Sequence, residues 1–137
     1  MFIGRGEELK FLEDRYNSAD GQLVVLYGRR RVGKTELLRQ FCQDKEHVFY
    51  TCTEIIDEKQ LEAFSQRLLE KNKQAAKYIT RFSDWEQALL SITELAKDKK
   101  IVVVIDEFTY MVKGNNAIPS ILQKLWDEVL KQSNVML

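Results

Sequence analysis

Apolar residues recur along this chain with two different spacings, which alternate from one segment to the next. Apolar positions on one face of a helical turn predict helices, and short unbroken apolar runs predict buried strands. Helices are predicted over Glu7–Tyr16, Lys34–Gln43, Asp57–Glu70 and Trp85–Lys97, and a last helix begins near Pro119. Strands are predicted over Leu23–Tyr27, Val48–Thr53 and Ile101–Ile105, and another begins in Asn134–Leu137. This alternation predicts an α/β fold in which helices cover a mostly parallel sheet.

Several local signals refine these elements. The unbroken aliphatic character of Ile101–Ile105 predicts a strand that is buried on both faces. Asp57 with Gln60, and Ser83 with Glu86, have the spacing of a capping box at a helix start. No clear pattern covers residues 72–82, so we predict no element there.

Composition limits the class of protein. A chain of 137 residues is long enough for one domain with a core, which we place over residues 1–137. Lys and Arg together number 21, as do Asp and Glu, and this balance gives no case for general binding of nucleic acid or anionic membranes. The chain has no apolar run of membrane-spanning length and no apolar stretch near its start, so we expect a cytoplasmic protein that binds no membrane.

Cysteine and histidine are too few for most metal centres. Cys42 lies on an apolar helical stripe and Cys52 within an apolar strand-like run, and His47 is the single histidine. We therefore predict two buried thiols rather than a disulfide or a metal pair. The same count argues against a Ser-His-Asp catalytic triad.

One segment matches the phosphate-binding pattern G-x-x-x-x-G-K-T/S at every fixed position. It reads Gly28, Arg29, Arg30, Arg31, Val32, Gly33, Lys34, Thr35. Glycines allow the backbone to approach a phosphate closely, and successive N–H groups with the following helix start form an anion site. Lys34 is predicted to neutralise the β- and γ-phosphates, and the Thr35 hydroxyl to bind Mg²⁺.

A pair of acids follows the third predicted strand. Asp106 and Glu107 come directly after the aliphatic run, at the sheet edge where open α/β folds bind ligands. We predict that Asp106 holds Mg²⁺ and that Glu107 orients and deprotonates the attacking water. Together with the phosphate-binding segment, these residues predict a site for ATP or ADP with Mg²⁺, in which Lys34 and Glu107 are catalytic.

The three consecutive arginines leave several interpretations open. Arg29, Arg30 and Arg31 occupy the variable positions of the loop, where side chains often point away from the phosphates. They could pair with neighbouring acids or lie in solvent, contact a partner subunit, or contact the charge of the nucleotide.

These motifs together resemble the prokaryotic archaeal ATPase family, on the AAA+/STAND side of the P-loop ATPases. The resemblance rests on Phe2-Ile3-Gly4-Arg5, on Tyr27–Thr35 and on Ile105-Asp106-Glu107-Phe108, and it spans essentially the whole chain. It implies a three-layer α-β-α P-loop NTPase with Gly4 and Arg5 near the nucleotide. Relatives often carry a lid and a DNA-binding-like or nuclease-like region further on, so nucleic acid is expected only through regions outside this chain.

The resemblance also implies where the last strand lies. Such ATPases insert the strand after the last helix between the first and third strands, where it carries a polar sensor residue. Only Asn134–Leu137 represent that strand here, so we expect a truncated central strand and a partly empty slot between Leu23–Tyr27 and Ile101–Ile105. We therefore expect this chain to turn over ATP slowly and to bind a protein partner or another copy of itself.

Three functions are compatible with these motifs. The first is ATP binding and hydrolysis by the core of a larger AAA+/STAND-like protein. The second is a nucleotide-gated switch that presents a surface to partners with negligible turnover. A P-loop kinase is the third, although we find no second substrate pocket for it in the sequence.

Overall fold

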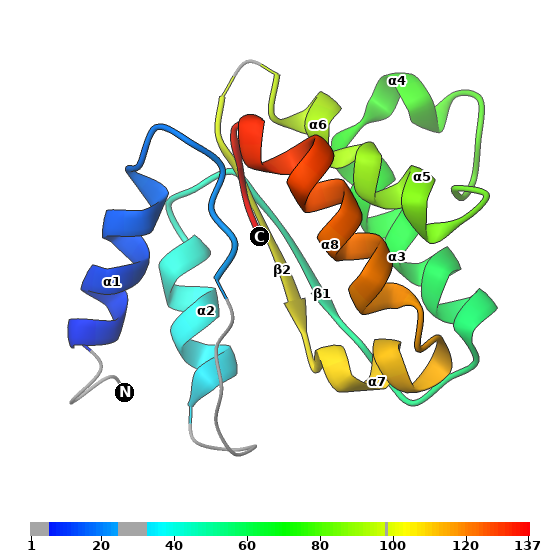
Figure 1. The fold of residues 1–137 in the computed structure, drawn as a ribbon, viewed down its shortest axis with the longest axis horizontal. Helices are drawn as coiled ribbons and strands as arrows, with labels where there is room; N and C mark the ends of the chain where they lie inside the picture. Colours follow the sequence, from blue (N-terminus) through cyan, green and yellow to red (C-terminus); the bar gives the residue numbers. More distant parts are fainter. Residues whose placement is uncertain (1–5, 25–32, 98) are drawn as a thin grey trace.

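The computed structural model describes residues 6–24, 33–97 and 99–137 (Figure 1). Its strands are β1 (His47–Thr51), β2 (Ile101–Asp106) and β3 (Val135–Met136). Its helices are α1 (Gly6–Tyr16), α2 (Lys34–Cys42), α3 (Asp57–Lys71), α4 (Lys73–Ala76), α5 (Trp85–Leu90), α6 (Ile92–Leu95), α7 (Phe108–Gly114), α8 (Ile118–Glu128) and a 3₁₀ turn, η1 (Leu130–Gln132). The fold is therefore α/β, as the alternation of apolar spacings predicts.

The described strands form one parallel sheet in the order β1-β2-β3. Beyond β3, Gln22 pairs in parallel with Met136, and Val24 N–H donates to the Leu137 carbonyl at 2.9 Å. The last strand thus lies between β2 and the segment that precedes the phosphate-binding motif, which confirms the predicted insertion. Of the predicted strand Leu23–Tyr27, residues 25–27 lie outside the described part of the chain.

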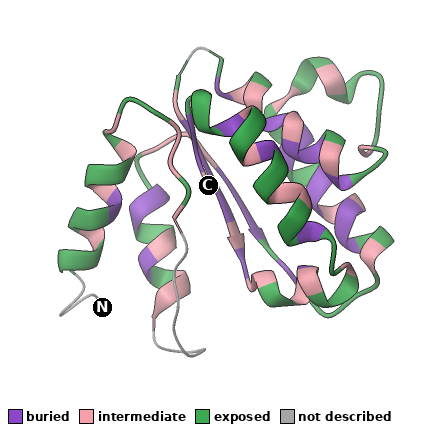
Figure 2. Ribbon diagram, in the orientation of Figure 1, coloured by how far each residue is buried: buried purple, intermediate pink, exposed green. Residues whose placement is uncertain are grey.

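Helices cover both faces of the sheet (Figure 1). On one face α1 and α2 pack against Phe49, Val102 and Val104, and on the other face α3, α5 and α8 pack against the residues between them, such as Val48 and Val103. Figure 2 shows the two long strands buried in the middle of the molecule, and Ile101–Val104 are at most 7% exposed. The aliphatic run of β2 is buried on both faces, as its composition predicts.

Both predicted capping boxes are wrong. The residue that caps α5 is Asp84, whose carboxylate accepts the Gln87 N–H at 2.8 Å, so the cap lies one residue after Ser83. At α3 the N-cap residue is Ile56, which has no side-chain hydrogen bond to the helix. Asp57 instead bonds to side chains of other elements, because tertiary partners there compete with the local cap.

The predicted helix Trp85–Lys97 is divided into α5 and α6 at Ser91. The buried Ser91 hydroxyl donates to the Ala88 carbonyl at 2.6 Å, where it competes with the helical backbone bond. Two short helices were not predicted. Asn72 caps α4 through its side chain, and α7 has only seven residues, too few to give a clear helical periodicity.

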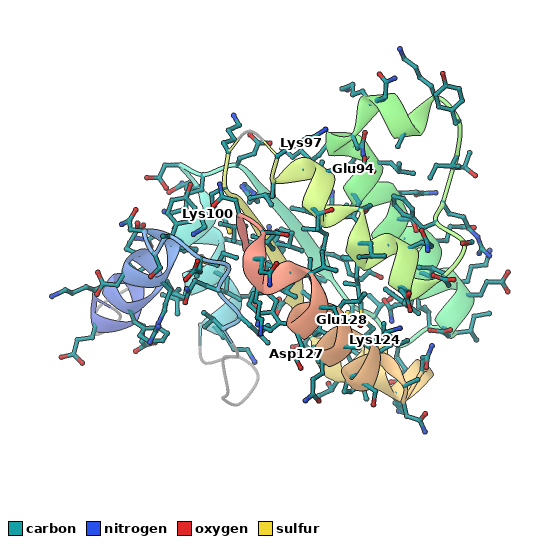
Figure 3. All side chains as sticks on the ribbon, turned by 45° about the horizontal axis from the view of Figure 1, so that its top comes forward. Glu94, Lys97, Lys100, Lys124, Asp127 and Glu128 are labelled. Carbon is teal, nitrogen blue, oxygen red and sulfur yellow. The ribbon has the colours of Figure 1, made fainter. Side chains whose placement is uncertain are left out.

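Two lysines attach α1 to the rest of the domain. The Lys45 ammonium donates to the Glu13 carboxylate at 2.5 Å and to the Phe41 carbonyl at 2.9 Å. Lys100, labelled in Figure 3, donates to the carbonyls of Tyr16 and Ser18 at the carboxyl end of α1. Burial lowers the pKa of Lys100, although Asp20 nearby opposes this shift. These contacts supplement a small apolar interface, since Leu12 is the buried residue of α1.

The backbone at Gly21 passes close to residues 130–133, which precede β3, and this close approach requires glycine at position 21. A Cβ atom at this position would lie 2.6 Å from the Leu130 carbonyl oxygen and 3.0 Å from that of Lys131. Gly21→Ala is therefore expected to destabilise the domain by about 1–3 kcal/mol, since these backbone atoms must move. Thermal unfolding followed by circular dichroism measures this, with Gly6→Ala as the control because a Cβ at Gly6 meets no atom within 4 Å. Equal melting temperatures for the two variants would contradict the prediction.

Candidate functional site

The candidate site begins at the amino end of α2. Gly33 has φ 82° and ψ 12°, a left-handed conformation that favours glycine over residues with a side chain. This turn places Lys34 and Thr35 in the first turn of α2, and the Gly33 carbonyl accepts the Leu37 N–H at 2.9 Å. The second glycine of the motif therefore has a conformational role in starting the helix.

Asp106, the last residue of β2, connects this helix start to the sheet. Its carboxylate is 3% exposed, and its Oδ2 accepts a hydrogen bond from Thr35 Oγ1 at 2.8 Å. Its other oxygen, Oδ1, accepts the backbone N–H of Glu107 at 3.0 Å. Two motifs far apart in the sequence thus meet in space, and the two predicted magnesium ligands are in direct contact.

Glu107 has an unusual backbone conformation. Its φ of 58° and ψ of 43° make it the one non-glycine residue with positive φ among the residues that the structure describes. It stands at the N-cap of α7, where its carbonyl accepts the Tyr110 N–H at 3.1 Å. A left-handed conformation costs roughly 1–2 kcal/mol for a residue with a Cβ, and such strain is common at functional sites.

This strain predicts a difference between two variants. Glu107→Gly is expected to be more stable than Glu107→Ala by roughly 0.5–1 kcal/mol, because glycine adopts positive φ without a clash but loses more chain entropy on folding. Urea unfolding measures both free energies. Lys113, an exposed residue of α7, is the matched control, since glycine there should be less stable than alanine by up to about 1 kcal/mol. The prediction fails if the difference has the same sign at both positions.

A cavity of about 430 Å³ adjoins these residues. Lys34, Asp106, Glu107 and Thr109 line its polar part. The rest is mainly apolar and lies between β2 and the segment before the motif, lined among others by Leu12, Leu23, Val24, Phe41, Val102, Val104, Met136 and Leu137. This position corresponds to the slot expected between the first and third strands.

The two cysteines are buried and free, as predicted. Burial raises the pKa of Cys52 to about 12, and the negative charges of Asp106 and Glu107 act in the same direction. Burial also raises the pKa of Cys42 to about 11. Both groups are neutral thiols at physiological pH, so neither is suited to act as a nucleophile.

Gln60, which sequence reasoning assigned to a capping box, instead has a role at the edge of the site. Its amide, 1% exposed, accepts the Thr53 N–H at 3.2 Å and donates to the Thr53 carbonyl at 2.8 Å. Its Oε1 also accepts the Tyr50 hydroxyl. Gln60 therefore fixes the loop that leaves β1 at the same sheet edge as Glu107. The available signal was a polar residue four positions before Phe64 on the core face of α3.

Part of the predicted site lies outside the described residues. This part comprises Gly4, Arg5, Gly28, Arg29, Arg30, Arg31 and Val32. Of the predicted site residues, the structure therefore places Gly33, Lys34, Thr35, Asp106 and Glu107, and it brings them to one end of the sheet.

Comparison with known proteins identifies the family. Residues 2–137 match the family described as an ATPase domain predominantly from Archaea, and the chain belongs to this family. An uncharacterized protein of Methanocaldococcus jannaschii is 33% identical over 137 residues, which is 100% of this chain and 28% of that protein. An uncharacterized ATP-binding protein of the same organism is 52% identical over 46 residues, which is 34% of this chain and 78% of that protein.

The chain thus spans little more than a quarter of the first of these relatives. Within the described part of the chain, no helix combines the length and the apolar character needed to cross a bilayer.

Proposed function

We propose that this domain binds ATP or ADP with Mg²⁺ at the amino end of α2 and hydrolyses ATP. The observation that carries the proposal is the 2.8 Å hydrogen bond between Thr35 Oγ1 and Asp106 Oδ2, which joins the phosphate-binding motif to the acid pair. Membership of an ATPase family supports it, as does the relative that is named an ATP-binding protein.

Phosphate binding is assigned to residues 28–35. Their backbone N–H groups, with the positive end of α2, would hold the phosphates, and Lys34 would neutralise the β- and γ-phosphate charge. The left-handed Gly33 and the position of Lys34 on the cavity wall support this assignment. Gly4 and Arg5 are proposed to lie near the nucleotide because the family resemblance implies it.

The residues present fit a magnesium ion. Thr35 offers a hydroxyl oxygen and Asp106 a carboxylate, and Mg²⁺ prefers such oxygen ligands together with water and substrate phosphates. The bound ion would neutralise charge on the β- and γ-phosphates during transfer. Asp106 holds the Thr35 hydroxyl in place through Oδ2, and its Oδ1 is fixed by the Glu107 N–H.

Glu107 is proposed as the general base. It lines the same cavity as Lys34, so a water between its carboxylate and the terminal phosphate could lose a proton to the carboxylate. Its left-handed backbone supports this role, because strained conformations persist where the surrounding structure holds them for function. The adjacent Asp106 carboxylate accepts hydrogen bonds from Thr35 Oγ1 and from the Glu107 N–H, which suits it to hold Thr35 and Mg²⁺ rather than to take up a proton.

At the level of the whole domain, we propose a three-layer P-loop NTPase core over residues 1–137 of an AAA+/STAND-like protein. β3 lies where such ATPases place the strand that carries the sensor residue. A nucleotide-gated switch with negligible turnover is the second candidate. It is favoured by the apolar part of the cavity, which continues directly from the acid pair and offers a surface for a polypeptide partner.

Titration calorimetry with ATP, with and without Mg²⁺, tests the proposal. Wild-type protein should bind ATP more tightly with Mg²⁺ than without it. Thr35→Ala should lose most of this difference, because it lacks one of the proposed ligands. Thr80→Ala, an exposed threonine between α4 and α5, is the control and should behave as wild type. No binding at millimolar ATP would refute the assignment. Binding by calorimetry with no phosphate release in a separate assay would favour the switch.

A further inference from the structure

Helix α7 connects the proposed catalytic Glu107 to a partly buried junction of side chains at its other end. The helix has seven residues, so it is only about 10 Å long, and its carboxyl end lies about that far from Glu107. Asn115 ends the helix, and its N–H donates to the carbonyls of Met111 and Val112, both at 3.1 Å. A contact that fixes the position of Asn115 therefore also fixes the carboxyl end of α7.

Asp57 holds Asn115. Its Oδ2 accepts the Asn115 Nδ2–H at 3.3 Å, and its Oδ1 accepts the indole N–H of Trp85 at 2.8 Å. Trp85 is 3% exposed and packs in the core at the start of α5. Asp57 therefore joins the first turns of α3 and α5 to the end of α7, and both of its carboxylate oxygens are used.

Backbone packing brings α3 and α7 together at the same place. A Cβ added to Gly114 would lie 3.6 Å from the Cα of Asp57 and 3.7 Å from the Ile55 carbonyl oxygen, an ordinary contact distance. In the middle of α7, Met111 is 2% exposed and belongs to the main core. The helix is thus held by apolar packing at Met111 and by a polar contact at Asn115, while the strained Glu107 is its N-cap residue.

We propose that Asp57 and Asn115 are positioning residues for Glu107, because their hydrogen bond fixes the end of the helix that Glu107 begins. The orientation of both side chains is determined by their other partners. Asn115 Oδ1 accepts the Ala117 N–H at 3.0 Å, so its Nδ2 group must face Asp57. The proposal rests on the proposed hydrolytic role of Glu107, and neither positioning residue needs to touch the nucleotide.

A reciprocal exchange of the two residues gives a sharp test. In Asp57→Asn two amide groups compete, because the new Nδ2 would face the Asn115 Nδ2, and a flip would remove the acceptor from Trp85. In Asn115→Asp two carboxylates would face each other. The double variant Asp57→Asn/Asn115→Asp can retain the bonds to Trp85 and Ala117 and reverse the direction of the central one.

Two measurements on the intact protein decide the matter, both well below the melting temperature of each variant. Each single variant should hydrolyse ATP roughly tenfold or more slowly with an unchanged Kd, since misplacement by about 1 Å can cost about 100-fold in rate. Amide exchange of α7, followed by mass spectrometry, should accelerate in parallel. The double variant should recover both. Lys113→Ala on the same helix removes an exposed ion pair with Glu54 and should change neither.

Other outcomes are equally informative. Unchanged kcat in folded single variants, or no recovery in the double variant, would overturn the proposal and leave the junction a purely structural one. If a single variant does not fold, Asn115→Ala removes the same bond without opposing charges and takes its place. If wild-type protein binds ATP but releases no phosphate, the proposed hydrolysis fails, and exchange of α7 alone decides whether Asp57 and Asn115 hold the helix.

Discussion

Replacement of Lys34 by alanine is expected to weaken ATP binding at least tenfold. Lys34 lies in the first turn of α2 and lines the cavity that Asp106 and Glu107 also line. In that position its ammonium would neutralise the negative charge of the β- and γ-phosphates, and among the residues that the structure describes it is the main cation placed to do so. Hydrogen bonds to charged groups contribute about 1.5–3 kcal/mol, which corresponds to more than tenfold in Kd. Titration calorimetry with Mg-ATP measures the change directly.

A matched lysine separates this effect from loss of a surface charge. Lys77→Ala removes an exposed lysine at the end of α4, on the opposite side of the molecule from the amino end of α2 (Figure 1). It should bind ATP as wild type does. Equal affinities for Lys34→Ala and wild type would mean that the motif does not bind the phosphates.

Much of this site could be predicted because its chemistry depends on local sequence. Gly33 is left-handed and starts α2, as a motif glycine at a tight turn must. Asp106 ends a strand buried on both faces, and parallel strands deliver such residues to one sheet edge. The contact between Thr35 and Asp106 follows from combining these two local facts with a parallel sheet.

The missed features depend on contacts between distant segments. Asp57 fits a capping pattern in the sequence, but Trp85 and Asn115 bind its carboxylate in the fold. Likewise, the apolar stripe of residues 85–97 predicts one helix, but the structure has two, and the buried Ser91 hydroxyl donates to the Ala88 carbonyl where they meet. Periodicity does not contain such information, because tertiary partners compete with local hydrogen bonds and override them.

The strand order illustrates a third case. The apolar pattern predicts the start of a strand in Asn134–Leu137 but not its place in the sheet, and β3 lies between β2 and Gln22. That position was predicted from the family resemblance, since periodicity alone gives no strand order. The structure confirms it through the pairing of Ile101 with Val135 and of Gln22 with Met136.

Replacement of Glu107 by glutamine is expected to separate binding from turnover. Glutamine keeps the size and the left-handed backbone of the residue but cannot accept the proton of the attacking water. Hydrolysis should fall by roughly 100-fold or more, since a positioned general base contributes about 10²–10⁴-fold. The Kd for Mg-ATP should stay within about twofold of wild type, because Lys34, Thr35 and Asp106 are unchanged.

The measurement is a phosphate-release assay on the intact protein beside titration calorimetry on the same samples. Glu128→Gln serves as the control. It changes an exposed carboxylate at the end of α8, and Glu128 is labelled in Figure 3. Its turnover should equal that of wild type. A Glu107→Gln protein with wild-type turnover would assign the base to another residue, and one that no longer binds ATP would make Glu107 part of the binding site instead. A selective loss of hydrolysis would explain why a carboxylate stands at a backbone position that favours glycine.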